Sequence, residues 1–389
     1  MPDQYTETTK TGWGTRLGRS FKGIFIGILL FIASFVLLYW NEGRLDLSTI
    51  ASEAINIPST EFTDDPLEGS LISTTGVLTT EETLSDDMYL EQGDYVKVER
   101  IVEMYAWVEK SESSSEINYG GSETTETTYS YEKEWTSNPQ NSSGFKVSEG
   151  HENPSLDIQS ETFVVEEAKV GVYKIDPQKM SLLSGDELML SEDLVDFGDE
   201  YLTSIRNNYI YKEKSYSDGP EVGDIRIMYK VLRPNQDVTV FGKLSGSSIV
   251  PYTDQKEGAT IYRMFSGTPE QAVVQMHSEY TWSIWVLRIL GLILMWVGLM
   301  MVLEPISTLL DVLPFMGSLS RGLVKLLTFI IAFVLSVVTI VISMIFHNII
   351  ALVIVLVIVV GAIIFFVKTK GKDMLTKKKD ELKLKQNKE

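Results

Sequence analysis

Few residues of this 389-residue chain are of types that carry out chemistry. The chain contains three histidines and no cysteine, which excludes thiol catalysis, disulfides and thiolate metal ligands. The sequence motifs of zinc proteases, serine hydrolases, P-loop nucleotide-binding proteins and dinucleotide-binding proteins are absent. We therefore predict that the chain is not an enzyme and has no catalytic residue, no cofactor and no metal ligand.

The strongest single candidate is His151, in the sequence Gly-His-Glu-Asn-Pro-Ser that starts at Gly150. An imidazole beside the carboxylate of Glu152 can transfer protons, provided that partner groups lie within reach. A loop histidine that hydrogen-bonds the backbone is the more frequent case. We therefore keep His151 as a candidate interaction residue and not as a catalytic one.

The charges are segregated along the chain, whose formal net charge is -19. Residues 41–283 carry 45 acidic and 18 basic side chains, whereas residues 368–389 carry nine basic and four acidic ones. This excess of acidic side chains in the middle region argues against a nucleic-acid partner. The acidic run at 186–200 offers oxygen ligands for calcium, but it lacks EF-hand spacing and favours a solvated helix face instead.

Four long apolar runs predict membrane-spanning helices. At 1.5 Å per residue each run covers most of a hydrocarbon core of about 30 Å. The first run could also be a signal peptide, but it is too long and is followed by Asn41-Glu42, not by a small-residue cleavage site. The predicted spans are residues 23–40, 284–303, 326–346 and 349–367.

Basic residues beside the spans predict their orientation. The basic N-terminus (1–22), the loop 304–325 and the Lys-rich tail (368–389) are assigned to the cytosol, and residues 41–283 to the lumen or exterior. Arg288 lies near the start of the second span, where its side chain is expected to reach the headgroup level.

The sequence of the acidic middle region predicts a β-rich structure. Residues 95–110 alternate between apolar and charged side chains, which is typical of a half-buried strand. Residues 225–231 and 238–241 are expected to form a hairpin across the turn 234–237. The predicted fold class is therefore a four-span α-helical membrane protein with a β-rich (α+β) extracytosolic domain inserted between spans 1 and 2.

Irregular and helical pieces are expected to interrupt the strands. Two polar stretches, 110–126 and 137–144, are rich in Ser, Thr, Asn and Glu and are predicted to be exposed hairpin tips or mobile loops. Helical pieces are expected near 186–197 and 269–280.

Small and polar residues of the first span are candidates for packing and topology. Gly23 and Gly27 are spaced as a GxxxG pair, which lets another helix or a second copy approach closely. Gly43 is expected to end the helix in a left-handed cap, with the aromatic and basic side chains of the motif at headgroup level. The candidate motif consists of Asn41, Glu42, Gly43 and Arg44.

Several motifs in order resemble the LUMA family, also called the transmembrane protein 43 family. They are Tyr-Trp-Asn-Glu-Gly-Arg at 39–44, Val-Glu-Met-Tyr-Ala-Trp-Val-Glu at 102–109, the stretches 127–135 and 150–155, and Gly-Pro-Glu-Val-Gly-Asp-Ile-Arg at 219–226. The resemblance implies a four-span protein without known enzymatic activity. In animals it implies the endoplasmic reticulum and inner nuclear membrane and a link to lamins and emerin. Members also occur in bacteria, and the cysteine-free composition favours a bacterial cell membrane.

These observations favour a membrane-organising scaffold that acts through its extracytosolic domain and through self-associating spans. The expected partners are the lipid bilayer, further copies of the chain or another protein, and no nucleic acid. Two alternatives remain: a transport or channel component lined by the third and fourth spans, and an envelope-modifying enzyme that uses His151.

Overall fold

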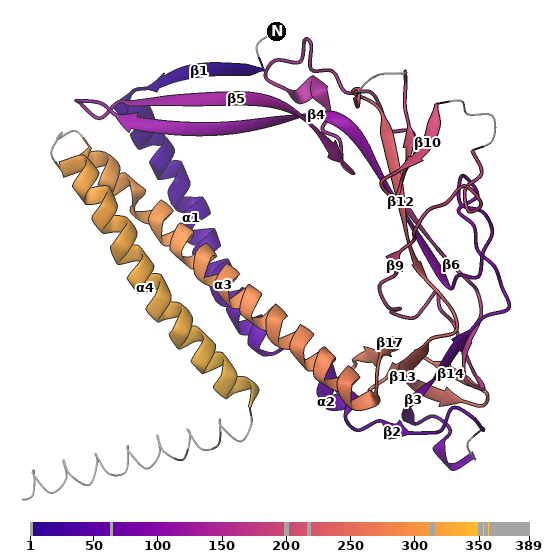
Figure 1. Ribbon diagram of the computed structural model, residues 1–389. Coiled ribbons are helices and arrows are strands. Elements are labelled where there is room, and N and C mark those ends of the chain that lie inside the picture. The colour runs from indigo at the N-terminus through magenta and orange to yellow at the C-terminus, as the bar shows by residue number, and fades with distance from the viewer. Residues whose placement is uncertain are drawn as a thin grey trace, which may run out of the picture. The chain divides into compact units, whose positions relative to one another are not determined.

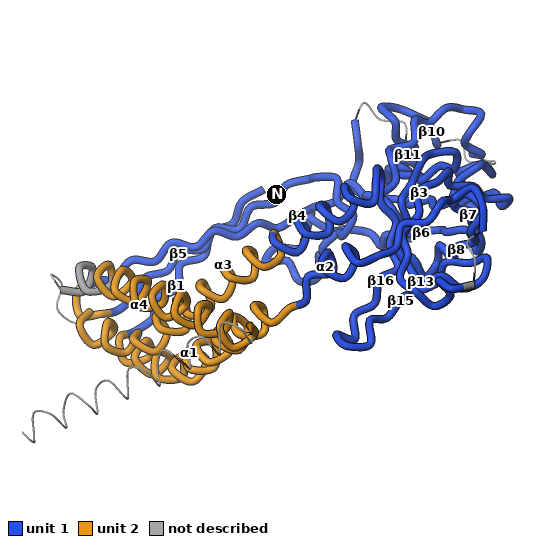
Figure 2. The backbone as a smooth tube through the Cα atoms, turned by 90° about the horizontal axis from the view of Figure 1, so that it is seen from below, with its two compact units in different colours: residues 1–12, 45–118, 122–281 blue, residues 13–44, 119–121, 282–389 orange. Residues whose placement is uncertain are grey.

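The computed structural model describes residues 3–62, 65–197, 202–215, 219–311 and 316–348, with the single residues Val353 and Val357. It forms two compact units (Figure 2). We call the first, residues 1–12, 45–118 and 122–281, the β unit, and the second, residues 13–44, 119–121 and 282–389, the helical unit. Each is described by itself.

The β unit contains an eight-stranded sheet built around β4 (Figure 1). As the alternating pattern predicts, Val98, Val102 and Met104 of β4 are fully buried, while Glu99 and Glu103 point outward. The strands are, in sheet order, β1 (Gln4–Thr11), β5 (Glu123–Thr136), β4 (Lys97–Ile117), β12 (Ile225–Leu232), β11 (Tyr209–Lys212) and β10 (Thr203–Arg206), with β6 (Glu161–Val164) beside β4 and β9 (Asp186–Glu187) beside β12.

A second sheet of seven strands closes on itself, because β13 pairs with both β14 and β3. The closed part is a small barrel. Its strands are β17 (Arg263–Ser266), β13 (Asp237–Ser245), β14 (Ser248–Val250), β8 (Tyr173–Ile175), β7 (Ala168–Val170), β3 (Leu71–Thr79) and β2 (Ile55–Asn56). A two-stranded sheet, β15 (Tyr252–Thr253) and β16 (Thr260–Ile261), completes the β unit.

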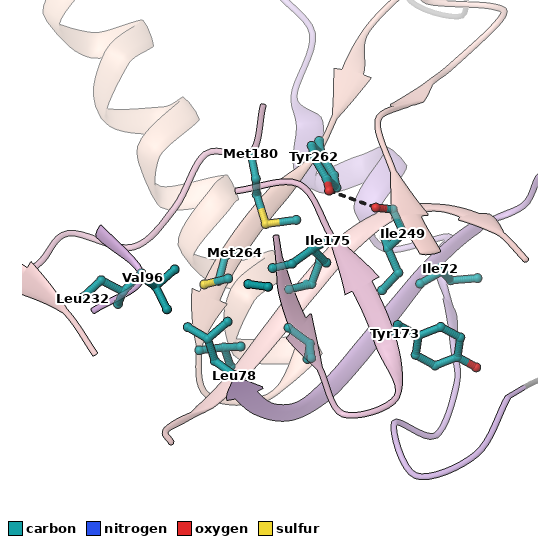
Figure 3. Close-up of a cluster of buried hydrophobic side chains, with 14 of the residues drawn as sticks. Ile72, Leu78, Val96, Tyr173, Ile175, Met180, Leu232, Ile249, Tyr262 and Met264 are labelled. Carbon is teal, nitrogen blue, oxygen red and sulfur yellow. Dashed lines mark hydrogen bonds between the residues drawn. The ribbon is translucent and has the colours of Figure 1, made fainter. Parts of the chain in front are cut away.

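Apolar side chains of the second sheet and its loops fill one core (Figure 3). Ile72, Tyr173 and Val240 are fully buried in it. The hydroxyl of Tyr262 donates a hydrogen bond of 2.9 Å to the carbonyl of Ile249, so this buried polar group is satisfied. Burial raises the pKa of Tyr262 to about 12, which keeps the phenol protonated.

Beyond Met104, β4 leaves β12 and continues with β5 to Ile117 as a two-stranded extension. β1 adds a third strand, pairing Gln4–Thr11 with residues 123–130 of β5. We call this three-stranded part, β1, β5 and residues 105–117 of β4, the ribbon. Its tip turns through Gly120 and Gly121, whose φ values of 82° and 80° favour glycine. The stretch 110–126, predicted to be a loop or hairpin tip, is therefore mostly strand.

The strand pairing joins two segments that the predicted layout assigns to opposite sides of the membrane. Residues 4–11 pair along their whole length with residues 123–130 of β5. The layout places 1–22 in the cytosol and all of 41–283 on the opposite side. The alternating pattern identifies β4 and β5 as strands, but it carries no information about a partner more than a hundred residues away.

Two other expectations about the middle region are wrong. β12 and β13 do not pair with each other: β12 joins β4 and β11 in the first sheet, and β13 joins β3, β14 and β17 in the second. The turn at Asn235, whose φ is 64°, therefore connects two sheets and not two arms of a hairpin. Residues 186–197 contain β9 and turns but no helix, because Leu188 and Val195 reach the core from extended backbone.

Among its described residues, the helical unit contains three long helices that are apolar and long enough to cross a membrane. They are α1 (Trp13–Glu42), α3 (Pro269–Leu310), whose first turns belong to the β unit as the sequence indicates for 269–280, and α4 (Met316–His347). These helices contain the first three predicted spans. The predicted fourth span and the Lys-rich tail lie outside the described residues, apart from Val353 and Val357.

A short helix, α2 (Leu47–Ala51), follows the end of α1 and is capped by Asp46. One carboxylate oxygen of Asp46 accepts a hydrogen bond of 2.9 Å from the backbone N–H of Ser48, and the other lies 2.7 Å from Nδ1 of His277. Burial alone raises the pKa of Asp46, but these hydrogen bonds outweigh it and hold the pKa below its usual value. The remaining helical pieces are the 3-10 turns η1 (Asp65–Leu67) and η2 (Ser142–Gly144).

We expect Asp46→Ala to lower the free energy of unfolding by about 1 kcal/mol, because the first turn of α2 loses its capping acceptor. For a unit of this size that corresponds to a melting temperature lower by about 2–4 °C. Asp46→Asn keeps a capping oxygen and serves as the control, since the His277 side chain is largely exposed and its ion pair contributes little. Equal losses in the two variants would show that the cap is not the cause.

Candidate functional site

Most of the candidate residues meet where α1 ends beside α3. Glu42 accepts two hydrogen bonds from the guanidinium of Arg288, 2.8 Å from Nε and 2.7 Å from NH2. The side chains are 4% and 18% exposed, so this is a largely buried ion pair. Arg288, which the sequence predicts near the headgroup level, therefore has a carboxylate partner 246 residues earlier in the chain. We call Asn41, Glu42, Arg44, Ser283 and Arg288 the junction cluster.

Asn41 contributes a second link between the same helices. Its amide Nδ2 donates a hydrogen bond of 3.1 Å to the carbonyl of Ile284, and the side chain is fully buried. Its Oδ1 atom has no hydrogen-bond partner among the described residues. An unsatisfied buried acceptor costs stability, typically about 1–3 kcal/mol. Asn41 is thus the least satisfied member of the junction cluster.

Gly43 and Arg44 complete the end of α1. Gly43 is not in the left-handed conformation that the sequence suggested, since its φ is not positive. A glycine is required for a different reason: a Cβ atom here would overlap the imidazole of His347. Arg44 donates a hydrogen bond of 3.0 Å to Ser283 and lies 5.6 Å above the Trp40 ring.

The two glycines of the α1 pair differ in how closely α3 approaches them. A Cβ atom on Gly27 would lie 2.8 Å from the carbonyl oxygen of Gly298 in α3, and a Cβ on Gly298 would lie 2.8 Å from the carbonyl of Gly27. At Gly23 the nearest atom would be 3.5 Å away, on Glu304. Within this chain, the small face of Gly27 is therefore occupied by α3.

Gly27→Val is expected to lower the stability of the helical unit by about 1–3 kcal/mol, because the added carbons meet the backbone of α3 and force the helices apart. Gly23→Val is the matched control, on the same helix one turn earlier, where an added Cβ makes only an ordinary van der Waals contact with side-chain atoms. The measurement is the temperature at which each variant, purified in mild detergent, loses its monodisperse elution peak. Similar midpoints for the two variants would refute the close contact.

His151 lies apart, in the β unit, and is almost completely buried. Its ring stacks on Tyr131 with centroids 4.0 Å apart and meets the edge of Trp107 at 4.7 Å. Its Nδ1 atom lies 3.1 Å from the carbonyl oxygen of Val147. This is the backbone contact that is most frequent for a loop histidine. Glu152 instead accepts a hydrogen bond from Gly150. The arrangement is aromatic packing beside a hollow of about 670 Å³.

The described residues include no group of three or more His, Cys, Asp or Glu side chains placed to hold a metal ion. The acidic run considered for calcium falls partly outside them, since residues 198–200 are not described.

One buried polar network, centred on Asp86, was not predicted from the sequence. Asp86 accepts hydrogen bonds from Tyr229 (2.5 Å) and Arg100 (3.1 Å), and from the backbone N–H groups of residues 88–90. The Arg100 side chain is 5% exposed and that of Asp86 is fully buried. The residues come from separate strands and a loop, so no local spacing identifies them.

The ribbon tip adds a cluster at the other end of the helices. Arg16 donates to the carbonyl of Gly121 (2.6 Å) and pairs with Asp311 (2.8 Å). The indole of Trp13 donates to the carbonyl of Thr308 (2.9 Å), and a Cβ on Gly121 would meet the Trp13 ring. The start of α1, the end of α3 and the ribbon tip are thereby joined.

Comparison with known proteins decides the family. A family model described as Transmembrane protein 43 matches residues 104–349, more than half of the chain. The chain belongs to the transmembrane protein 43 family. Transmembrane protein 43 of Mus musculus and of Homo sapiens are each 30% identical to it, over 326 and 324 residues, covering 79% of this chain and 80% of the relative. The homolog of Drosophila melanogaster is 29% identical over 309 residues, 75% of this chain and 77% of its own.

No solved structure matches the chain. Membership of the transmembrane protein 43 family and three apolar helices make this a membrane-embedded, multi-pass protein with a large β-rich region. The family match covers β5, residues 105–117 of β4, Arg288 and α4, but it includes neither β1 nor residues 41–44. The relatives found are animal proteins, and they give no support to the bacterial membrane that the composition favoured.

Proposed function

We propose that this chain is a non-enzymatic, membrane-organising scaffold that holds a protein partner on its β unit and associates with further copies of itself. A scaffold needs a preformed binding surface and a firm attachment to the bilayer. α3 supplies the attachment, since it is continuous from the β unit core at Ala272 and Met276 into its apolar segment.

One surface of the first sheet carries the proposal. The guanidinium of Arg226 lies 4.7 Å from the Trp135 ring and 4.5 Å from the Tyr209 ring, and that of Arg206 lies 4.5 Å from the Tyr211 ring. Trp, Tyr and Arg are the residues that contribute most to protein–protein binding energy. Stacking holds these side chains in place before a partner arrives, which lowers the entropy cost of binding. We call these five residues the aromatic–arginine surface.

A hollow of about 260 Å³ adjoins this surface and is lined by Trp135, Tyr211, Glu213 and Asp224, among others. The aromatic rings that line it suit a cationic or aromatic side chain of a partner protein. The hollow is small for a substrate but sufficient for one anchoring residue.

The test compares the protein mass that copurifies in mild detergent. Trp135→Ala combined with Tyr211→Ala should remove the partner, because both anchors are truncated. Tyr119→Ala, which removes an exposed tyrosine at the ribbon tip, should retain it. A wild-type protein that is strictly monomeric and carries neither partner nor lipid, by light scattering and mass spectrometry, would rule out a scaffold.

The transport alternative has less support. Three hydroxyl groups of α4 could line a polar path, but each has a partner inside the protein. Thr339 donates to the carbonyl of Leu335 in its own helix, Ser336 contacts the sulfur of Met295, and Ser343 donates to the carbonyl of Tyr39. All three are engaged in helix packing or within their helix.

A further inference from the structure

A nitrogen of the buried His151 side chain lacks a hydrogen-bond partner beside the hollow described above. Because Nδ1 contacts the carbonyl oxygen of Val147, which can only accept, Nδ1 carries the proton of the neutral ring and Nε2 is an acceptor. Among the described residues, Nε2 has only a longer contact of 3.9 Å with Oδ1 of Asp3, beyond hydrogen-bond range. Both residues line the hollow, so two acceptors face each other there. A buried acceptor of this kind favours a ligand that donates to it.

The same hollow offers a donor and aromatic walls. Trp107 and Lys133 lie opposite each other in the register of β4 and β5, so they share one face of the sheet. The ammonium of Lys133 lies 4.6 Å from the centre of the Trp107 ring. Tyr105 and Trp107 are only half-buried and line the hollow. Its volume of about 670 Å³ is typical of sites for small ligands.

The charges around the hollow favour an uncharged ligand. An anion would meet the carboxylate of Asp3 and the lone pair of His151, and a cation would meet the ammonium of Lys133. A zinc ion takes three or four protein ligands, and no such group occurs among the described residues. A hydroxyl group carries no charge and both donates and accepts hydrogen bonds. Hydroxyl groups therefore suit all three side chains.

The spacing of the two acceptors distinguishes between neutral groups. Neighbouring hydroxyls of a sugar ring are gauche, which places their oxygens about 2.8–2.9 Å apart. Donating side by side, they can reach two acceptors that are 3.9 Å apart, as Nε2 of His151 and Oδ1 of Asp3 are. The N–H bonds of one amide or ammonium nitrogen diverge more widely, and at hydrogen bonds of about 2.9 Å they require acceptors about 4.7–5 Å apart. The measured spacing therefore fits a vicinal diol.

We propose that the hollow beside His151 is a sugar-binding site. Two neighbouring hydroxyls of the sugar donate to His151 and Asp3, and another hydroxyl accepts from Lys133. The C–H groups of the ring pack on the aromatic side chains, whose faces are negative. This activity is separate from the binding of a protein partner on the aromatic–arginine surface.

The test measures the binding of glucose, mannose and galactose to the full-length protein by saturation-transfer NMR, in a detergent without a sugar headgroup. We expect the wild type to bind at least one of them. Asp3→Ala, at a largely exposed side chain, should weaken that binding about tenfold or more, because a hydrogen bond to a charged group is lost. Asp94→Ala, another exposed aspartate of the β unit, is the matched control and should bind as the wild type does.

Two variants at position 151 test the nitrogen itself. His151→Phe keeps an aromatic ring against Tyr131 but removes the acceptor, and it should weaken binding at least as much as Asp3→Ala. His151→Gln can place its side-chain oxygen near the position of Nε2 and should restore part of the binding. Near-UV circular dichroism of each variant checks that the β unit is folded.

The methyl glycosides of the three sugars separate two sources of the ligand. If they bind as well as the free sugars, the ligand is the end of a glycan; if they do not bind, it is a free sugar. Wild-type protein that binds none of the sugars, or Asp3→Ala that binds them as the wild type does, would overturn the site. Binding of Nα-acetyl-lysine amide in place of the sugars would overturn it in favour of an ammonium ligand. The partner that copurifies through the aromatic–arginine surface should remain in His151→Phe, so the two proposals fail independently.

Discussion

Replacing Glu42 by Gln is expected to destabilise the helical unit by about 3–5 kcal/mol, because it removes the carboxylate that neutralises a largely buried guanidinium. Arg288→Gln leaves the Glu42 carboxylate buried and should cost a similar amount. The effect is measured as the loss of thermal stability of the purified protein in mild detergent, followed by tryptophan fluorescence.

The double variant Glu42→Gln/Arg288→Met is the control for charge. It removes both ions and leaves no uncompensated charge, so it should lose less stability than either single variant. Groups that act independently would instead show additive losses. Additive losses would therefore contradict the ion pair.

Asp86→Asn is expected to cost the β unit about 3–5 kcal/mol, because Arg100 loses its buried carboxylate partner and the turn at residues 88–90 loses a charged acceptor. Tyr229→Phe removes only one hydrogen bond to that carboxylate and should cost about 1.5–3 kcal/mol. Chemical denaturation of the full chain measures both. A larger loss for Tyr229→Phe than for Asp86→Asn would show that the carboxylate is not the centre of the network.

The same carboxylate should make the β unit sensitive to acid. Burial raises the pKa of Asp86, but hydrogen bonds from Tyr229, from the N–H groups of Leu90 and Tyr89 and from Arg100 outweigh burial and hold the pKa below its usual value. The contribution of Asp86 is therefore complete above the ordinary carboxyl pKa of about 4 and is lost as the pH falls through the lower folded value. Between pH 5 and 2 the wild type should lose stability more steeply than Asp86→Asn. Parallel slopes would exclude this group as the cause.

The period of the hydrophobic pattern and the length of the apolar runs predict those helices and strands that are specified by residues close together in sequence. The alternation at 95–110 identified β4, because the side chains on one face of that strand are buried in a hydrophobic core and those on the other face are partly solvated. The apolar runs identified the membrane-compatible segments of α1, α3 and α4, because the length and hydropathy of such a segment are read directly from its own residues.

Partners distant in sequence could not be predicted in this way. Glu42 and Arg288 each look like an edge residue of its own span, and only packing of the two helices makes them a pair. The turn at 234–237 contains residue types that are typical of a hairpin turn, but the strands on either side of it belong to different sheets. For the candidate site, the sequence located residues 41–44 but did not pair them with Arg288, Ser283 and His347, which lie across from them.

α3 is a single helix of 42 residues, about 63 Å long, whose first turns pack in the β unit through Ala272 and Met276 and whose later turns carry Arg288 and Gly298. Hydrogen bonding along a helix resists twisting, so the element transmits torque. A partner that turned the base of α3 by a few degrees would rotate the surface contacting Gly27 by the same angle. The contact between Gly27 and Gly298 is too close to admit one methyl group, so it cannot absorb such a rotation without a change in packing. Binding at the first turns of α3 would therefore change how its later turns pack against α1.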